Sequence, residues 1–246
     1  MIFTAETLIE ITGTEYIMKT LAIITARGGS KRIPRKNIKD FMGKPMLAYA
    51  IEAALKSGLF AEVMVSTDDN EIAEIAKKYG AEVPFMRSEA TANDFATTRD
   101  VLVEVVEEYK KRGKVFENVG CIYPCVPFLT AEILKEAYDK FLTSGAGILL
   151  PVVRFSFPIQ RALRINEKGF GEFREPQYAL TRSQDLEPMY HDVGMFYFFK
   201  DTYFVENETA SQKTVLFEMN ESVIQDIDTV DDWAMAELKY KIKYGM

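Results

Sequence analysis

Residues 21–37 read LAIITARGGSKRIPRKN. The first five, LAIIT (21–25), form a continuous apolar run, which is typical of a strand buried on both faces of a parallel sheet. The next twelve hold two adjacent glycines, a serine and five cationic side chains, although the chain of 246 residues carries a net charge of −7. The stretch predicts a strand followed at once by a cationic loop. That loop would lie at the carboxyl edge of an open α/β sheet, where such folds bind ligands.

Short apolar strands and amphipathic helices continue to alternate along the chain. Pro45 and Gly58 bound the first helix, and Asn70 is predicted to cap the second. Strands separated by helices of this length imply right-handed βαβ units, so we expect an α/β fold: a three-layer α/β/α sandwich around a Rossmann-like, mostly parallel sheet. The further strands are predicted at 61–66, 82–86, 119–123, 147–153, 194–199 and 222–228, and the helices at 45–56, 71–79, 98–112, 130–142 and from 229 onward.

Two segments depart from this alternation. Residues 1–17 contain three glutamates and no Lys or Arg, the wrong charge for a secretory signal. Because Met18 opens the first strand, we interpret 1–17 as an extension of a single domain spanning 18–246. Residues 154–192 are rich in Arg, Phe, Pro and Gln without a clean period, and we interpret them as an inserted arm.

Composition excludes several classes of protein. The acidic balance argues against a nucleic-acid binder. No apolar run approaches the roughly 18 residues that a membrane span needs, so we expect no membrane partner. The absence of a targeting signal predicts a cytoplasmic location. One histidine and two cysteines, Cys121 and Cys125, are too few for a zinc site or a disulfide scaffold. We expect both thiols to be reduced core residues.

The cationic loop suits a polyphosphate. From Arg27 to Lys44 the chain has seven basic residues and one acid, while a nucleoside triphosphate carries about four negative charges. Gly28 and Gly29 let the backbone approach such a ligand and turn its amides toward it. The G-x-G-x-x-G and P-loop spacings are absent. We predict triphosphate binding, chiefly by Arg27 and Lys36, and the alternative is a solvated basic loop.

Asp226 and Asp228 form a second candidate site. They are two residues apart on a predicted strand end, so their side chains would emerge on the same face. Two carboxylates in this arrangement suit a Mg²⁺ ion that bridges phosphate oxygens. The alternative is that the two aspartates help to cap the last helix.

The loop 26–37 resembles the signature of the sialic acid cytidylyltransferases, which use CTP to join a nine-carbon acidic sugar to CMP. The resemblance runs from Met18 onward through VSTDD (65–69), RSEATANDFATT (87–98), YPCVPF (123–128) and QDIDT (225–229). It implies a nucleotidyltransferase-type fold, CTP and an acidic nine-carbon sugar as substrates, and Mg²⁺ as cofactor.

Two further segments bear on the sugar. FPIQRAL (157–163) and TRSQDLEPMYHDVG (181–194) are most similar to family members that use pseudaminic acid. The alternatives are a legionaminic- or sialic-type sugar or, in another class, a catalytically silent nucleotide-binding regulator. The arm at 154–192 matches a segment that reaches across a dimer partner in this family, so a homodimer is expected.

The resemblance also implies residue roles. Tyr123 stands where relatives often carry glutamine, and a helix N-cap is the alternative role for Thr98. His191 and Asp192 replace the Arg and Asn of sialic acid relatives. Independently of the resemblance, Asp68 and Asp69 are expected to be turn residues because they follow a predicted strand. The catalytic set is Lys36, Arg27, Asp226 and Asp228, the last two binding metal. The nucleotide-binding set is Arg27, Gly28, Gly29, Ser30, Lys36, Asn37, Arg87, Ala96 and Thr98. The sugar-binding set is Tyr123, Gln160, Arg182, Gln184 and His191.

Overall fold

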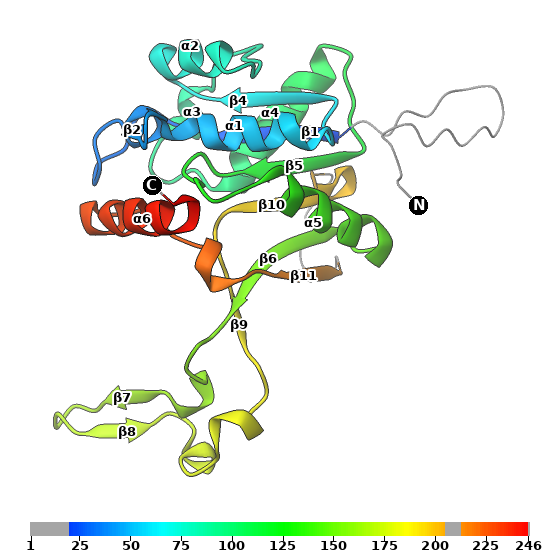
Figure 1. The fold of residues 1–246 in the computed structure, drawn as a ribbon. Helices are drawn as coiled ribbons and strands as arrows, with labels where there is room; N and C mark the ends of the chain where they lie inside the picture. The colour runs from blue at the N-terminus through cyan, green and yellow to red at the C-terminus, as the bar shows by residue number, and fades with distance from the viewer. Residues whose placement is uncertain (1–19, 205–212, 246) are drawn as a thin grey trace.

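A seven-stranded sheet forms the centre of the structure, a computed structural model that describes residues 20–204 and 213–245 (Figure 1). The strand order is β11-β6-β10-β5-β1-β4, and β9 pairs with β6 outside this path. The extension predicted at 1–17 lies outside the described residues. The strands are β1 (Thr20–Thr25), β4 (Glu62–Ser66), β5 (Asn118–Ile122), β6 (Ile148–Arg154), β9 (Tyr190–Asp192), β10 (Phe196–Lys200) and β11 (Thr214–Glu218).

The sheet is mostly parallel, as predicted. β1 pairs in parallel with β4 and β5, and β11 pairs in parallel with β6. β10 runs antiparallel between β5 and β6. Because β5 and β6 both oppose β10, they point the same way. The carboxyl ends of β1, β4, β5, β6 and β11 therefore lie at one edge of the sheet.

Helices cover both faces of the sheet, which confirms the three-layer sandwich. Ala22 and Ile24 of β1 pack into a cluster with α1, α2 and α5, whereas Leu21 and Ile23 pack into a second cluster with α4. All four side chains are fully buried, as the unbroken apolar run predicts. The helices are α1 (Met46–Ser57), α2 (Asn70–Lys78), α3 (Glu89–Ala92), α4 (Thr98–Lys111), α5 (Ala131–Ser144) and α6 (Val230–Tyr244).

The closing helix α6 packs beside the small hairpin of β2 (Asp40–Phe41) and β3 (Lys44–Pro45). Trp233 of α6 meets Phe41 edge-on, with ring centroids 5.4 Å apart. Thr229 and Asp232 form a capping box at the start of this helix. The packing anchors the segment before α6 close to the cationic loop.

Two predicted strands are wrong. Residues 82–86 make a single isolated bridge, from Glu82 to Met64, and Pro84 has no N–H to extend the ladder. Residues 222–228 begin with a 3₁₀ turn at Glu221–Val223 and continue as chain without a sheet partner. The last strand is instead β11, whose side chains are alternately exposed and half-buried and whose apolar run is only three residues long.

The predicted cap of α2 is also wrong by one residue. Asp69 precedes the helix, and its side chain accepts a hydrogen bond from the N–H of Ile72 at 3.0 Å. Asn70 is the first helical residue instead. The shift matters because Asp69 also contacts the cationic loop.

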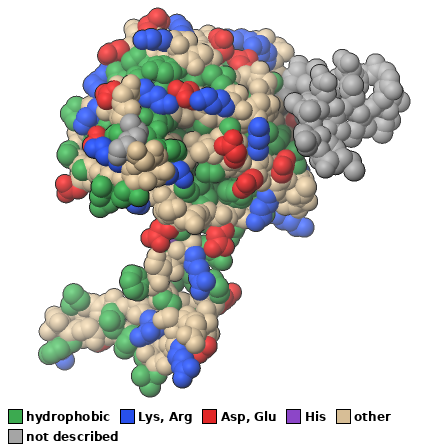
Figure 2. Space-filling view, viewed as in Figure 1, with side chains coloured by type: hydrophobic (Ala, Val, Ile, Leu, Met, Phe, Trp, Pro, Cys, Tyr) green, Lys and Arg blue, Asp and Glu red, His purple; other side chains and the backbone are tan. Residues whose placement is uncertain are grey.

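The segment predicted as an arm projects from the sheet (Figure 1). It leaves at the end of β6, forms the hairpin of β7 (Leu163–Ile165) and β8 (Gly171–Phe173), and returns through β9. Hydrophobic side chains are scattered over its surface (Figure 2). Among them, Phe157 is 86% exposed and Leu180 is 97% exposed.

The structure bears on two features predicted from composition, membrane-spanning helices and the two cysteines. Within residues 20–204 and 213–245, no helix is both long and apolar enough to cross a bilayer. Cys121 is buried and Cys125 partly buried, and both are free thiols. The cytoplasmic location and the absence of a nucleic-acid partner stay predictions.

Candidate active site

Two cavities adjoin at the carboxyl ends of β1 and β5. The first, of about 410 Å³, is lined by the cationic loop and Asp228. The second, of about 320 Å³, is lined by Arg87, residues between Thr91 and Val101, and Tyr123. Thr25, Arg27 and Pro124 line both cavities. We call the first the phosphate cavity and the second the nucleoside cavity.

The two cavities bring together most of the predicted nucleotide-binding set. Gly28 and Gly29 belong to the same loop without lining either cavity. Arg27, Ser30, Lys36 and Asn37 line the phosphate cavity, and Arg27, Arg87, Ala96 and Thr98 line the nucleoside cavity.

The loop cations are not free, because carboxylates from other elements pair with them. Arg32 and Lys36 both contact Asp228, at 2.9 and 3.4 Å, and Lys36 also donates to the carbonyl oxygen of Ile227 at 2.5 Å. Arg27 lies 2.8 Å from Asp94, which also pairs with Lys31. The large positive excess expected from the loop alone is thus offset by acids distant in sequence.

The loop is also anchored to the end of β4. The N–H of Gly28 donates to Asp68 at 2.8 Å, and Arg35, in the left-handed conformation with φ of 55°, pairs with Asp69. The Arg35 guanidinium holds the pKa of Asp69 below its usual range. A Cβ on Gly28 would lie 2.8 Å from the Asp69 carboxylate, so this position requires glycine for close approach. Asp68 and Asp69, which follow β4, therefore hold the cationic loop in place as well as forming the turn after the strand.

Asn37 ties the loop to the end of β5. Its side chain is buried, and Nδ2 donates to the carbonyl oxygen of Arg27 at 2.8 Å. Its Oδ1 accepts a hydrogen bond from the Cys125 thiol at 3.3 Å. Both ends of the amide are thus used within the protein, which gives Asn37 a positioning role in this structure.

The nucleoside cavity contains a buried arginine. Arg87 is 8% exposed, and its guanidinium donates to Ser66 through Nε at 3.0 Å and Nη2 at 2.7 Å. Burial lowers the pKa of Arg87. No carboxylate of the described residues lies within ion-pair distance of Arg87, so this buried cation favours an electronegative ligand group.

Thr98 does not cap α4. The cap is Thr97, which forms a capping box with Asp100. The Thr98 hydroxyl instead lies 3.0 Å from the hydroxyl of Tyr123, and both residues line the nucleoside cavity. The capping alternative for Thr98 is therefore wrong, and its side chain is available at the cavity wall.

Asp226 and Asp228 lie close together, although they do not follow a strand. Burial, and then the Asp228 carboxylate, raises the pKa of Asp226. Neither side chain caps α6, because Thr229 does so, and this removes the capping alternative. No cluster of three or more His, Cys, Asp or Glu in the described part of the chain is arranged to hold a metal ion. A metal here would need ligands beyond this pair.

Most of the predicted sugar-binding set lies in the arm, away from the two cavities of the same chain. Tyr123 lines the nucleoside cavity, but Gln160 is buried and donates to the carbonyl oxygen of Glu187 at 2.8 Å. Arg182 is exposed, and His191 is exposed beside Phe155, with ring centroids 4.7 Å apart.

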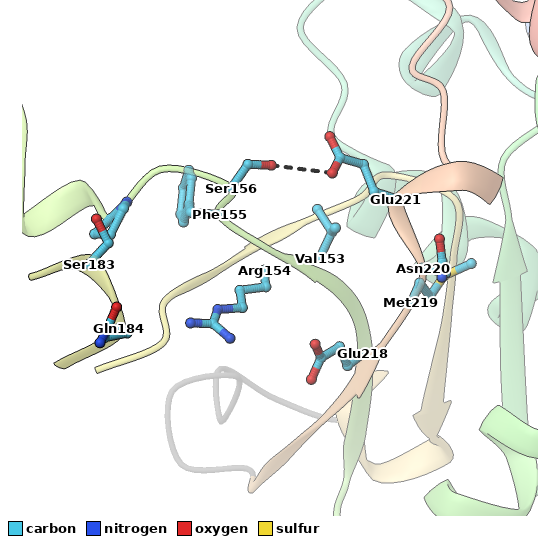
Figure 3. A pocket seen from close by; sticks show the side chains of 11 residues that line it. Val153, Arg154, Phe155, Ser156, Ser183, Gln184, Glu218, Met219, Asn220 and Glu221 are labelled. Atoms are coloured by element: carbon cyan, nitrogen blue, oxygen red, sulfur yellow. Dashed lines mark hydrogen bonds between the residues drawn. The ribbon is translucent and has the colours of Figure 1, made fainter. Parts of the chain in front are cut away.

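Gln184 lines a separate cavity of about 580 Å³ at the root of the arm (Figure 3). Its lining includes Arg154, Glu218 and Glu221, and Glu221 accepts a hydrogen bond from Ser156 at 3.2 Å. Acids outnumber cations in this lining, so the cavity does not suit a polyphosphate despite its size.

Sequence reasoning missed two residues near the site, Asp94 and Tyr197. Asp94 pairs with two loop cations. Tyr197 meets the ring of Tyr123 edge-on at 5.6 Å and donates to Asp192 at 2.8 Å. Asp94 lies within the quoted segment 87–98, which was a usable signal, whereas the contacts of Tyr197 depend on the antiparallel pairing of β10 with β5.

Comparisons with known proteins show which proteins this chain resembles in sequence. Residues 21–220 match a family described as "Cytidylyltransferase". The chain is 41% identical to a pseudaminic acid cytidylyltransferase of Campylobacter jejuni subsp. jejuni serotype O:2, over 92% of this chain and 98% of that protein. It is 32% identical to a CMP-N,N'-diacetyllegionaminic acid synthase of Legionella pneumophila, over 89% of this chain and 95% of that protein.

The fold has solved relatives as well. A CMP:2-keto-3-deoxy-manno-octonic acid synthetase complexed with CTP superposes with a TM-score of 0.66 at 19% identity. The match covers 93% of this chain and all of that one. At this identity the likeness supports the fold alone.

We predict that Asn37→Ala lowers the free energy of unfolding by about 1–3 kcal/mol, because it leaves the half-buried Arg27 carbonyl and Cys125 thiol without their partner. Chemical denaturation measures the change. Cys125→Ser, which keeps a donor for Oδ1, is the matched control and should cost less. Equal stability of Asn37→Ala and the unmodified protein would contradict the anchoring role.

Proposed function

The chain belongs to the cytidylyltransferase family, and on that basis we propose that it transfers CMP from CTP to pseudaminic acid with release of pyrophosphate. The reaction class follows from the family, so the chain is a nucleotidyltransferase. The observation that best supports the substrate pair is the pair of adjoining cavities, one cationic and one lined by Arg87, Ala96 and Thr98.

The choice of sugar is supported by similarity. The pseudaminic acid relative is 41% identical over nearly its whole length, against 32% for the legionaminic acid relative. A legionaminic- or sialic-type acceptor is the alternative within the same chemistry. A silent nucleotide-binding regulator is disfavoured because Lys36, Asp226 and Asp228 are all present at the phosphate side.

The chemistry requires alignment and charge stabilisation more than covalent work by the protein. The sugar's anomeric oxygen forms a bond to the α-phosphorus, the bond to the bridging oxygen of pyrophosphate breaks, and the hydroxyl proton passes to solvent. Lys36 and Arg27 line the phosphate cavity, where their charges would stabilise the leaving pyrophosphate. Lys36 is held there by the Ile227 carbonyl oxygen.

The residues present fit a Mg²⁺ ion. Asp226 and Asp228 offer two carboxylates beside the phosphate cavity, and Mg²⁺ usually takes one or two carboxylates together with water and substrate phosphates. When bound, Mg²⁺ would supply positive charge against the phosphate oxygens. Asp228 would have to loosen its contacts with Arg32 and Lys36 to serve as a ligand.

We also propose that the arm joins two copies of the chain. Leu163 and Ile165 lie on the same face of β7, and Phe173 lies opposite Leu163 on β8. Their exposed fractions are 62%, 81% and 37%. An exposed apolar face of this kind on a projecting hairpin favours a protein interface. A dimer would also account for predicted sugar-binding residues that lie away from the cavities of their own chain.

Pyrophosphate release tests the proposed reaction. The purified protein is supplied in turn with CTP, ATP, GTP and UTP, each with pseudaminic, N-acetylneuraminic or legionaminic acid. We expect the highest rate with CTP and pseudaminic acid. Faster turnover of another sugar would replace the acceptor, while CTP binding without turnover would favour the regulator.

We predict that Asp228→Ala lowers turnover by roughly a hundredfold or more, about 2.7 kcal/mol of transition-state stabilisation. The variant would lose a proposed Mg²⁺ ligand, and it would also lose the carboxylate that contacts Lys36. Thr229→Ala is the contrasting variant, because loss of a helix cap costs about 1 kcal/mol of stability and should leave turnover near normal. Melting temperature and magnesium-dependent rate are measured on both. A normal rate in Asp228→Ala would remove its catalytic assignment.

We predict a dimer in solution that Ile165→Asp converts to monomer, because the new charge would be buried at the interface. Light scattering at micromolar concentration gives the mass. Val115→Asp, at an exposed apolar position outside the arm, is the control and should remain dimeric. A monomeric unmodified protein would refute the proposed interface.

A further inference from the structure

Asp94 occupies two of the cations that a triphosphate would need. Its Oδ1 lies 2.8 Å from Nη1 of Arg27, and its Oδ2 pairs with Lys31. Nη1 of Arg27 also donates to the carbonyl oxygen of Asn93 at 3.2 Å. Arg27 lines both cavities and Lys31 lines the phosphate cavity. One carboxylate thus bridges two loop cations where phosphate oxygens are expected.

The chain around Asp94 holds the carboxylate toward the loop. Oδ1 of Asn93 accepts hydrogen bonds from the N–H groups of Phe95 and Ala96, at 2.8 and 3.0 Å, and its Nδ2 donates to the carbonyl oxygen of Ala90 at 2.7 Å. The N–H of Ser88 donates to Glu104 of α4 at 2.8 Å. These bonds do not involve the loop, so the turn that presents Asp94 is fixed independently of the cations it contacts.

The electrostatics favour an exchange of anions. Lys31, and then Arg27, holds the pKa of Asp94 below its usual range, so the carboxylate is charged at neutral pH. Its side chain is 45% exposed, and exposed ion pairs of this kind are weak. A triphosphate with about four negative charges competes well against a single carboxylate at the same two cations.

We propose that Asp94 is an affinity-determining residue of this enzyme: its carboxylate competes with the triphosphate for Arg27 and Lys31, leaves them when CTP binds and returns when pyrophosphate departs. The inference rests on the proposed function, because CTP supplies the displacing phosphates. It assigns Asp94 the opposite effect from a ligand-binding residue, since removing its charge strengthens nucleotide binding.

Calorimetric titration without sugar tests the competition, with CTP and inorganic triphosphate as separate ligands. We expect Asp94→Asn to bind both about threefold to tenfold more tightly, because two weak pairs no longer compete. Pyrophosphate should also inhibit the variant more strongly. Glu89→Gln is the matched control. It removes a charge from the same segment, where Glu89 makes no ion pair with any described residue, and should leave both affinities unchanged.

Each outcome bears on one hypothesis. Unchanged or weaker binding by Asp94→Asn overturns the competition, and so does equal tightening by Glu89→Gln, which would show only a net-charge effect. If the unmodified protein binds no CTP, the proposed function fails, and inorganic triphosphate still tests the exchange. Asp94→Ser serves as a second variant if the asparagine form has a lowered melting temperature.

Discussion

Five cations within ten residues of one loop repel each other, and the rest of the site depends on how that repulsion is relieved. Carboxylates from three separate segments do so, each at a different place along the loop. Because these acids come from the end of β4, the turn after α3 and the segment before α6, the loop also ties those segments together. The pairs are Arg27 and Lys31 with Asp94, Arg32 and Lys36 with Asp228, and Arg35 with Asp69 and the nearby Glu71.

The sheet makes this arrangement possible. Parallel strands bring the carboxyl ends of β1, β4 and β5 to one edge, so the loops that follow them meet although they are far apart in sequence. The nucleoside cavity lies at the same edge, where Arg87 donates two hydrogen bonds to Ser66 at the end of β4. The polar groups of the two cavities therefore extend from strands that are almost entirely buried, which suits a reaction that needs alignment more than covalent catalysis.

The largest errors of the sequence interpretation came where helix and strand patterns were weak. β11 was missed because its apolar run, 215–217, is short and the strand lies at the edge of the sheet, where none of its side chains is fully buried. Residues 222–228 contain Val and Ile, which favour strands, but within residues 20–204 and 213–245 no strand pairs with them. Asp226 and Asp228 nevertheless lie close together, since the packing of α6 fixes the chain just before Thr229.

The sequence by itself determined the buried strand 21–25, the helices that cover it, the three-layer sandwich and the cationic loop, because these follow from local patterns of apolar and charged residues. Through the resemblance to a family it also indicated several residues that line the two cavities, among them Arg27, Lys36 and Arg87. Only the tertiary structure decided that the loop cations pair with Asp94 and Asp228. It also decided that the Asn37 side chain hydrogen-bonds to Arg27 and Cys125, and that the arm lies away from the two cavities of its own chain. The physical reason is that ion pairs and buried hydrogen bonds join residues far apart in the chain. A local sequence pattern does not show which of those distant residues come into contact.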